Sequence, residues 1–274
     1  MKTILVPTDF SKIARNAVDY AVEIAKLTKA RLILFNVYNL EIVPPGVPTI
    51  LPIDEMEKES TRELSKIERS IHQKHGDSIK IECRNRKGLP VDEINYYTEE
   101  HPVDLIVMGM TGAGFLGEKL IGSITTSIIK KAKCPVLVID KTVKFKKPKK
   151  ITLACDYREV SNKNILEPLL ELAKVFSAHI DVLHVVPEFE TVPSVSKTLE
   201  RIKFDHMLVS TDHSSHTTEN TDVIEGINDF AELNKSDMVV MIPRMHTGFE
   251  GFFFEPNTKR MAFHSKLPFL ALHH

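Results

Sequence analysis

The chain repeats itself, and this duplication restricts its fold more than any other feature of the sequence. The segment KTILVPTDFS at residues 2–11 is echoed by KITLACDYRE at residues 150–159. Further along, DLIVMGMTG at residues 104–112 matches DMVVMIPRM at residues 237–245. In each pair an apolar run of strand length stands next to an aspartate. We therefore expect two tandem copies of one domain.

The spacing between the matched segments supports the duplication and locates one difference between the copies. The two copies are offset by 147 positions at Asp9 and Asp156, but by 133 positions at Gly109 and Ile242. The first copy therefore carries 14 extra residues. We expect them in the proline-rich loop Val43–Asp54.

Each copy alternates apolar strands with amphipathic helical patterns. In the first copy, after two strands and a helix, the pattern predicts a helix at about residues 56–74, a strand near 79–84 and a helix at about 91–99. Strands of almost continuous Ile, Leu and Val indicate a parallel sheet covered by helices on both faces. The predicted fold class is therefore α/β, with two doubly wound parallel-sheet domains in tandem.

The proposed domain boundaries follow from the matched strands. We expect a first domain over residues 1–141, a basic linker over 142–149 and a second domain over 150–274. Six of the ten residues in 141–150 are lysines. We interpret this run as a solvated linker rather than as a nucleic-acid-binding patch.

Composition excludes several classes of partner. The 274 residues carry a net charge of -1, which gives no global attraction to nucleic acid or to anionic lipid. The apolar run Ile4–Pro7 is too short for a signal peptide, and no segment reaches transmembrane length. Cys83, Cys134 and Cys155 lack metal-site spacing and are interpreted as reduced thiols. We expect a cytoplasmic protein without membrane or nucleic-acid partners.

A glycine-rich segment after the fourth predicted strand of the first copy carries the chemistry. Its pattern is Gly109-x2-Gly112-x9-Gly122-Ser123, followed by a helical pattern. Glycines let the backbone approach a ligand closely, and free amides at a helix start attract phosphate. The hydroxyls of Ser123 and Thr125 add donors. The alternative is an ordinary glycine-rich turn in which Ser123 is the helix N-cap.

With this glycine pattern, a first strand ending in Pro-x-Asp and a closing CPVLV strand, the chain resembles the universal stress protein family. The resemblance implies a Rossmann-like sheet of strand order 3-2-1-4-5 in each domain. It also implies ATP, or AMP, at the carboxyl ends of strands one and four, with Mg²⁺ or Mn²⁺. The implied nucleotide-binding residues are Pro7, Thr8, Asp9, Val37, Met108, Gly109, Gly112, Gly122, Ser123, Ile124 and Thr125.

Three functions are compatible with this resemblance. The first is a regulatory module of the stress response that binds nucleotide, with its two domains paired within one chain and a homodimer possible. The second is a slow ATPase, for which Glu118 and Lys119 are candidate residues. The third is a nucleotide-free interaction protein. For Asp9, helix N-capping is the alternative to ligand contact.

The second copy departs from the glycine pattern. Gly109, Gly112, Gly122 and Ser123 correspond to Ile242, Met245, Glu255 and Pro256; the last two introduce a negative charge and remove an amide donor. We therefore expect no ATP in the second domain. The phenylalanine-rich segment at residues 248–256 is expected to pack on the neighbouring domain or to bind a partner.

Histidines cluster in the second copy without the spacing of a zinc site. They occur as Asp212-His213-x-x-His216 and Asp205-His206. No cysteine lies near them, so we expect a loop with solvated histidines and no metal.

Overall fold

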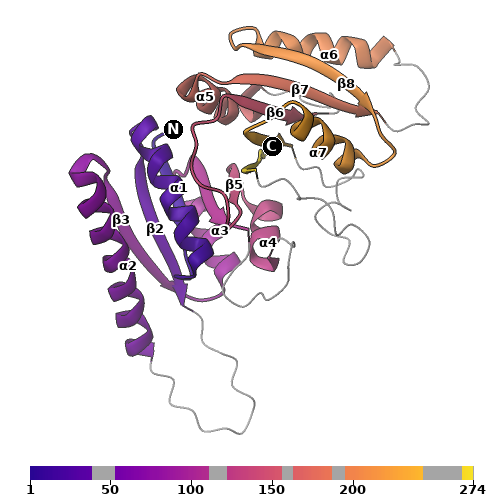
Figure 1. Ribbon diagram of the computed structural model, residues 1–274. Coiled ribbons are helices and arrows are strands. Elements are labelled where there is room, and N and C mark those ends of the chain that lie inside the picture. The colour runs from indigo at the N-terminus through magenta and orange to yellow at the C-terminus, as the bar shows by residue number, and fades with distance from the viewer. Residues whose placement is uncertain (39–52, 111–121, 156–162, 187–194, 243–266, 274) are drawn as a thin grey trace, which may run out of the picture. The chain divides into compact units, whose positions relative to one another are not determined.

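The computed structural model describes residues 1–38, 53–110, 122–155, 163–186, 195–242 and 267–273. These residues form two compact units, one extending to Lys141 and the other beginning at Thr142. Each unit is built around its own set of five parallel strands (Figure 1). The two units are therefore described one after the other.

The first unit has the strand order β3-β2-β1-β4-β5. Neighbouring strands run parallel throughout. The inner strands consist of buried Ile, Leu and Val because helices cover both faces of the sheet. This order confirms the predicted doubly wound fold. The strands are β1 (Thr3–Pro7), β2 (Arg31–Tyr38), β3 (Ile81–Lys87), β4 (Leu105–Gly109) and β5 (Val136–Ile139).

Four helices cover the first sheet, with α1 and α2 on one face and α3 and α4 on the other (Figure 1). The Ser11 hydroxyl caps α1 by accepting a hydrogen bond from the Ala14 amide. The alanines and aliphatic residues of α1 are buried against the sheet, as the helical pattern predicts. The helices are α1 (Lys12–Thr28), α2 (Ile53–His75, followed by a 3-10 turn at Gly76–Ser78), α3 (Pro90–Glu100) and α4 (Ser123–Lys131).

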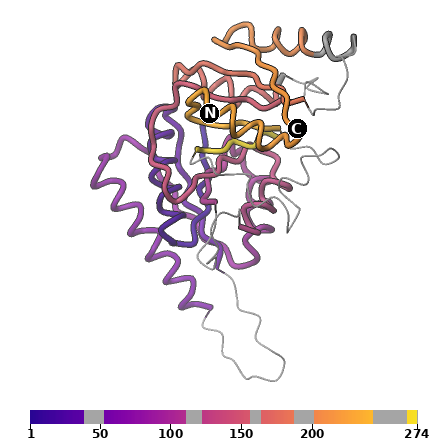
Figure 2. The backbone as a smooth tube through the Cα atoms, turned by 45° about the vertical axis from the view of Figure 1, so that its right-hand side comes forward, coloured from indigo at the N-terminus to yellow at the C-terminus, as the bar shows by residue number. Residues whose placement is uncertain are grey.

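The second unit repeats the topology in the order β8-β7-β6-β9-β10, which is again 3-2-1-4-5 in chain order. The helix expected before the last strand falls in residues 243–266, outside the described part of the chain. Figure 2 shows the course of the backbone from a second direction, with the helices visible as coils. The elements are β6 (Lys150–Ala154), a 3-10 turn (Lys163–Ile165), α5 (Glu167–Phe176), β7 (His179–Val186), α6 (Val195–Leu208), β8 (His213–Glu219), α7 (Val223–Leu233), β9 (Met238–Met241) and β10 (Phe269–Ala271).

An aspartate clamp holds the first and fourth strands of each unit together. In the first unit, Asp104 Oδ2 accepts hydrogen bonds from the amides of Lys2 and Thr3, at 2.6 and 2.8 Å. In the second unit, Asp237 Oδ2 accepts them from the amides of Lys149 and Lys150, at 2.9 and 3.2 Å. The duplication therefore extends to individual hydrogen bonds.

The extra residues of the first copy do not lie only in the proline-rich loop. Helix α2 has 23 residues, whereas its counterpart α6 has 14. The helix begins at Ile53, so much of the difference is an extension of α2. The prediction that the loop Val43–Asp54 holds all the extra residues is therefore wrong.

The three cysteines are free thiols. Burial, followed by the nearby Glu68 carboxylate, raises the pKa of Cys83 to about 12. Burial, followed by Asp104, raises the pKa of Cys134 to about 12. Thiols with such high pKa values are poor nucleophiles at neutral pH.

The linker lysines are exposed, although Lys146 Nζ donates a hydrogen bond to Asp237 Oδ1 at 2.9 Å, and the linker backbone follows the second unit. Val143 and Pro148 are buried, and the Phe145 ring meets the Phe176 ring edge-on at 6.5 Å.

Among the described helices, none is both long and apolar enough to cross a bilayer.

The clamp at Asp237 predicts a stability effect. Replacing Asp237 with Ala leaves the Lys149 and Lys150 amides without their acceptor, which is expected to lower the free energy of unfolding by about 1–3 kcal/mol. The matched control is Asp229→Ala, an exposed residue of α7, for which we expect a change within about 0.5 kcal/mol. Urea denaturation followed by circular dichroism measures both. Equal effects would contradict a clamp at Asp237.

The same clamp predicts a dependence on pH. Burial raises the pKa of Asp237, but hydrogen bonds from Lys146 and from the Lys149 and Lys150 amides outweigh it, so the net pKa is lowered. The stabilisation is therefore present above the unfolded pKa of about 3.9 and is lost as the pH falls through the lower folded value. The stability gap between wild type and Asp237→Ala should narrow below about pH 4.

Candidate functional site

The candidate site lies where the strand connections of the first sheet change direction. Strands β1 and β4 are neighbours, yet the chain leaves β1 towards β2 and leaves β4 towards β5. The residues that follow the two carboxyl ends consequently diverge, and open α/β sheets bind ligands at such points. Pro7 closes β1, while Met108 and Gly109 close β4. The topology thus brings these predicted site residues to one edge of the sheet.

Hydrogen bonds fix the turn that follows β1. The Thr8 amide donates to the Phe35 carbonyl at 2.8 Å, and the Thr8 hydroxyl accepts from the Phe10 amide at 3.1 Å. Asp9 is exposed and accepts from the Ser11 amide at 3.0 Å. Because Ser11 caps α1, the alternative that Asp9 is the helix N-cap is wrong.

A buried polar pair that sequence reasoning missed lies behind this turn. Asn36 of β2 donates from Nδ2 to the Thr8 carbonyl at 2.7 Å, and its Oδ1 accepts from the Ser60 hydroxyl of α2 at 2.7 Å. All three residues are buried. The only sequence signal is an amide side chain inside an otherwise apolar strand.

In the second unit a different side chain makes the corresponding hydrogen bond to the backbone. His184 Nδ1 of β7 lies 3.1 Å from the Cys155 carbonyl, which follows β6. Cys155 donates its amide to the Leu183 carbonyl, as Thr8 does to Phe35. A polar side chain from the second strand therefore secures the end of the first strand in both units.

Gly109 has a packing role at the end of β4. A Cβ at this position would lie 2.7 Å from Ile13 Cγ2 of α1, so Ile13 would have to shift to admit a side chain. The Gly109 carbonyl accepts a hydrogen bond from the buried Thr125 hydroxyl at 3.0 Å. The absence of a side chain at Gly109 is therefore explained by the approach of α1, and the Thr125 hydroxyl already has a partner in α/β packing.

Helix α4 begins with backbone donors, and no side chain among the described residues caps it. Gly122 is the N-cap, in an extended conformation, and its amide donates to the Met110 carbonyl at 2.7 Å. The interpretation of Ser123 as the N-cap is wrong, because Ser123 is the first helical residue. First-turn amides have no acceptor within their own helix. The side chains of Ser123 and Ile124 are exposed, whereas Gly122 and Thr125 are buried.

Helix α7 of the second unit shows the contrasting arrangement. The Asp222 carboxylate accepts from the amides of Ile224 and Glu225, at 2.9 and 3.3 Å. Its first-turn donors are thus satisfied by the protein itself. The start of α4 differs because a glycine stands at the capping position.

The structure places most of the predicted site residues. Val37 is half-buried on β2, directly after Asn36. Gly112, Glu118 and Lys119 lie outside the described residues. Within the described part of the chain, no group of three His, Cys, Asp or Glu side chains could hold a metal ion.

The blocked site expected in the second unit is described only in part. Ile242, the counterpart of Gly109, is a buried residue directly after β9. Met245, Glu255, Pro256 and the phenylalanine-rich segment at residues 248–256 lie outside the described residues. Their effect on nucleotide binding stays a prediction.

The expectation of a loop with solvated histidines is wrong for His213 and His216. Both belong to strand β8, which pairs with β7 along its whole length. His216 is half-buried, and its Nε2 lies 2.9 Å from Asp181 Oδ1. The sequence of β8 is polar and lacks the apolar residues that predict a strand. Its pairing with β7 holds it in the extended conformation.

Comparison with known proteins matches one family to each of the two copies. The model of the universal stress protein family matches residues 1–140 and 147–273. Universal stress protein MJ0531 of Methanocaldococcus jannaschii is 35% identical over 153 residues, covering 54% of this chain and 84% of that protein. The crystal structure of a universal stress protein from Archaeoglobus fulgidus covers 99% of this chain and 96% of its own, with 19% identity and a TM-score of 0.71. A universal stress protein in complex with cAMP covers 52% of this chain and 98% of its own, with 27% identity and a TM-score of 0.41.

The buried pair behind the turn predicts a stability effect at Asn36. Asn36→Ala leaves both the Thr8 carbonyl and the Ser60 hydroxyl unsatisfied, so we expect a loss of roughly 2–4 kcal/mol in the free energy of unfolding. The matched control is Asn85→Ala, which removes hydrogen bonds to Thr61 and to the Glu57 carbonyl at the exposed surface. Thermal and urea denaturation compare the two. A loss at Asn36 no larger than at Asn85 would contradict the role given to Asn36.

Proposed function

The chain belongs to the universal stress protein family, and from that premise we propose that its first domain binds an adenine nucleotide as a regulatory module of the stress response. The nucleotide is ATP or AMP, accompanied by Mg²⁺ or Mn²⁺. It occupies the edge formed by the carboxyl ends of β1 and β4. Its occupancy sets the conformation or the partner of the two-domain chain.

The start of α4 is the observation that supports this proposal most directly. Its N-cap is a glycine, and no side chain in the described part of the chain accepts a hydrogen bond from the amides of the first turn. Unsatisfied amides and the positive end of the helix dipole favour an anion at this place. A polyphosphate would accept these hydrogen bonds. Thr125 contributes its backbone amide, because its hydroxyl is bonded to the Gly109 carbonyl.

The turn after β1 supports the position of the nucleoside. The hydrogen bonds of Thr8 and Asn36 hold this turn in one conformation. A preorganised turn binds without an additional ordering cost. Asp9 presents an exposed carboxylate that can accept from a ribose hydroxyl, and the Val37 backbone can meet the adenine. Met108 and Gly109 complete the edge.

The proposal assigns a different role to each of the two domains. Residues 1–141 form the nucleotide-binding domain, and residues 150–274 form a domain that no longer binds ATP. The two domains pair within one chain, and the protein resides in the cytoplasm. One nucleotide per chain is the quantitative consequence.

Calorimetry with Mg-ATP tests the proposal through a charge variant that preserves the fold. Ser123→Glu places a carboxylate in the first turn of α4, where it stabilises the helix through the dipole but repels the triphosphate. We expect one site per wild-type chain and a loss of affinity of at least about a hundredfold in Ser123→Glu, or about 2.7 kcal/mol. The control Ser70→Glu adds the same charge at an exposed position of α2 and should bind as wild type does.

The outcomes separate the candidate functions. One site that disappears in Ser123→Glu, in a protein at least as stable as wild type, supports the proposal. Two sites per chain would contradict the prediction that the second domain is blocked. No detectable binding would favour an interaction protein that works without nucleotide.

A further inference from the structure

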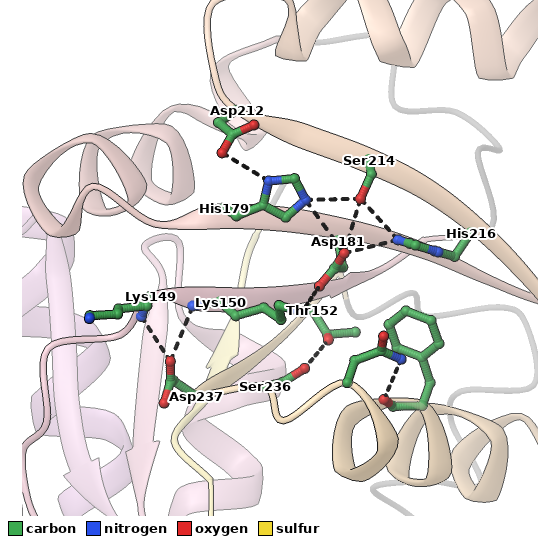
Figure 3. A network of polar contacts seen from close by, with 12 residues as sticks. Lys149, Lys150, Thr152, His179, Asp181, Asp212, Ser214, His216, Ser236 and Asp237 are labelled. Atoms are coloured by element: carbon green, nitrogen blue, oxygen red, sulfur yellow. Dashed lines mark hydrogen bonds and ion pairs between the residues drawn. The ribbon is translucent and has the colours of Figure 1, made fainter.

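Polar side chains on the second unit's sheet form a network that closes around one buried carboxylate (Figure 3). Asp181 of β7 is only 5% exposed and accepts from the Ser214 hydroxyl at 3.0 Å. His216 Nε2 lies 2.9 Å from the same oxygen, and His179 Nε2 lies 2.9 Å from the Ser214 hydroxyl. The outer nitrogen of His179 pairs with Asp212 at 3.0 Å. The carboxylates of Asp181 and Asp212 are therefore the anionic partners of the two histidines in this network.

The strand registers identify the same positions in the first unit. Leu32 pairs with Ile81 and Ile180 pairs with His213, so β2 and β3 superpose on β7 and β8 residue by residue. On this basis Arg31, Glu82 and Arg84 take the places of His179, Ser214 and His216. The buried Asp181 is replaced by the apolar Ile33. The first unit thus has arginines where the second has histidines, and it lacks the central carboxylate.

These arginines line a surface hollow next to the end of α3. Its lining includes three guanidinium groups, from Arg31, Arg84 and Arg86, and one carboxylate, from Glu82. Glu82 serves two of them: its Oε2 lies 3.8 Å from an Arg31 nitrogen, and its Oε1 accepts from Arg84 Nε at 2.5 Å. Within this lining two positive charges are in excess.

The hollow is accessible and partly preorganised. The side chains of Arg31 and Arg84 are 42% and 57% exposed, so a small ligand can reach both. The Thr3 hydroxyl accepts a hydrogen bond from Arg31 Nε at 3.0 Å and orients that guanidinium. The stacked rings of Tyr97 and His101, with centroids 4.2 Å apart, form a rigid wall.

We propose that this hollow binds a small phosphate-type oxyanion, with Arg31 and Arg84 as its principal ligands. Planar guanidinium forks match the oxygen geometry of phosphate, and a dianion would offset the excess charge. Glu82 occupies the arginines in the absence of ligand and competes with it. The hollow runs along β2 and β3 towards the proposed nucleotide site: Arg31 opens β2, Arg84 pairs with Phe35, and Arg86 of the lining pairs with Val37.

Calorimetric titration of the full chain with inorganic pyrophosphate, in sodium chloride of constant ionic strength, tests this proposal. Arg31→Gln and Arg84→Gln should each weaken binding by about tenfold, or about 1.4 kcal/mol. Glu82→Gln removes the competing carboxylate and should tighten binding several-fold. The control Arg69→Gln removes an exposed arginine of α2, outside the hollow, and should have no effect.

A second comparison distinguishes the hollow from the start of α4. Ser123→Glu should leave pyrophosphate binding at the hollow unchanged, even where it abolishes ATP binding. The proposal is overturned if wild type binds no pyrophosphate at millimolar concentration. It is also overturned if Ser123→Glu abolishes binding while Arg31→Gln does not, or if Glu82→Gln binds more weakly than wild type.

Discussion

The strand order reverses between the first and fourth strands of each unit, which are β1 and β4 in the first unit and β6 and β9 in the second. This reversal is the constraint on which the rest of each unit depends. The chain leaves these two neighbouring strands in opposite directions, so the residues after them are free to form turns at the edge of the sheet. An aspartate clamp ties the amino ends of the same two strands together. The amino ends of these strands are therefore fixed, whereas the residues after their carboxyl ends diverge.

The two units share this frame of strand order and backbone hydrogen bonds, and they differ in the side chains on the sheet surface. Backbone-directed hydrogen bonds recur at matched positions, with Asn36 in one unit and His184 in the other securing the end of the first strand. The side chains on the sheet surface have diverged, from arginines around Glu82 to histidines around Asp181. The frame depends on backbone groups that every sequence supplies, so side chains that do not contribute to it are free to change.

Sequence reasoning succeeded where a pattern has a local cause. The buried strands are continuous apolar runs, and the glycine before Ser123 marks the start of α4. It failed where the cause is distant in sequence. Strand β8 reads HSSHTTE and owes its conformation to pairing with β7. The Asn36–Ser60 pair joins residues 24 positions apart, and Gly109 packs against Ile13 of another element. No local period encodes such contacts.

We propose that the first turn of α4, which begins at a glycine N-cap, receives the phosphates while the second unit takes no part. Titration of ¹⁵N-labelled chain with Mg-ATP, followed by amide resonances, tests it most directly. The largest shifts are expected at the amides of Ser123, Ile124 and Thr125, while the amides of Ile224 and Glu225 of α7 stay unchanged. Shifts confined to the second unit, with the α4 amides unmoved, would contradict it.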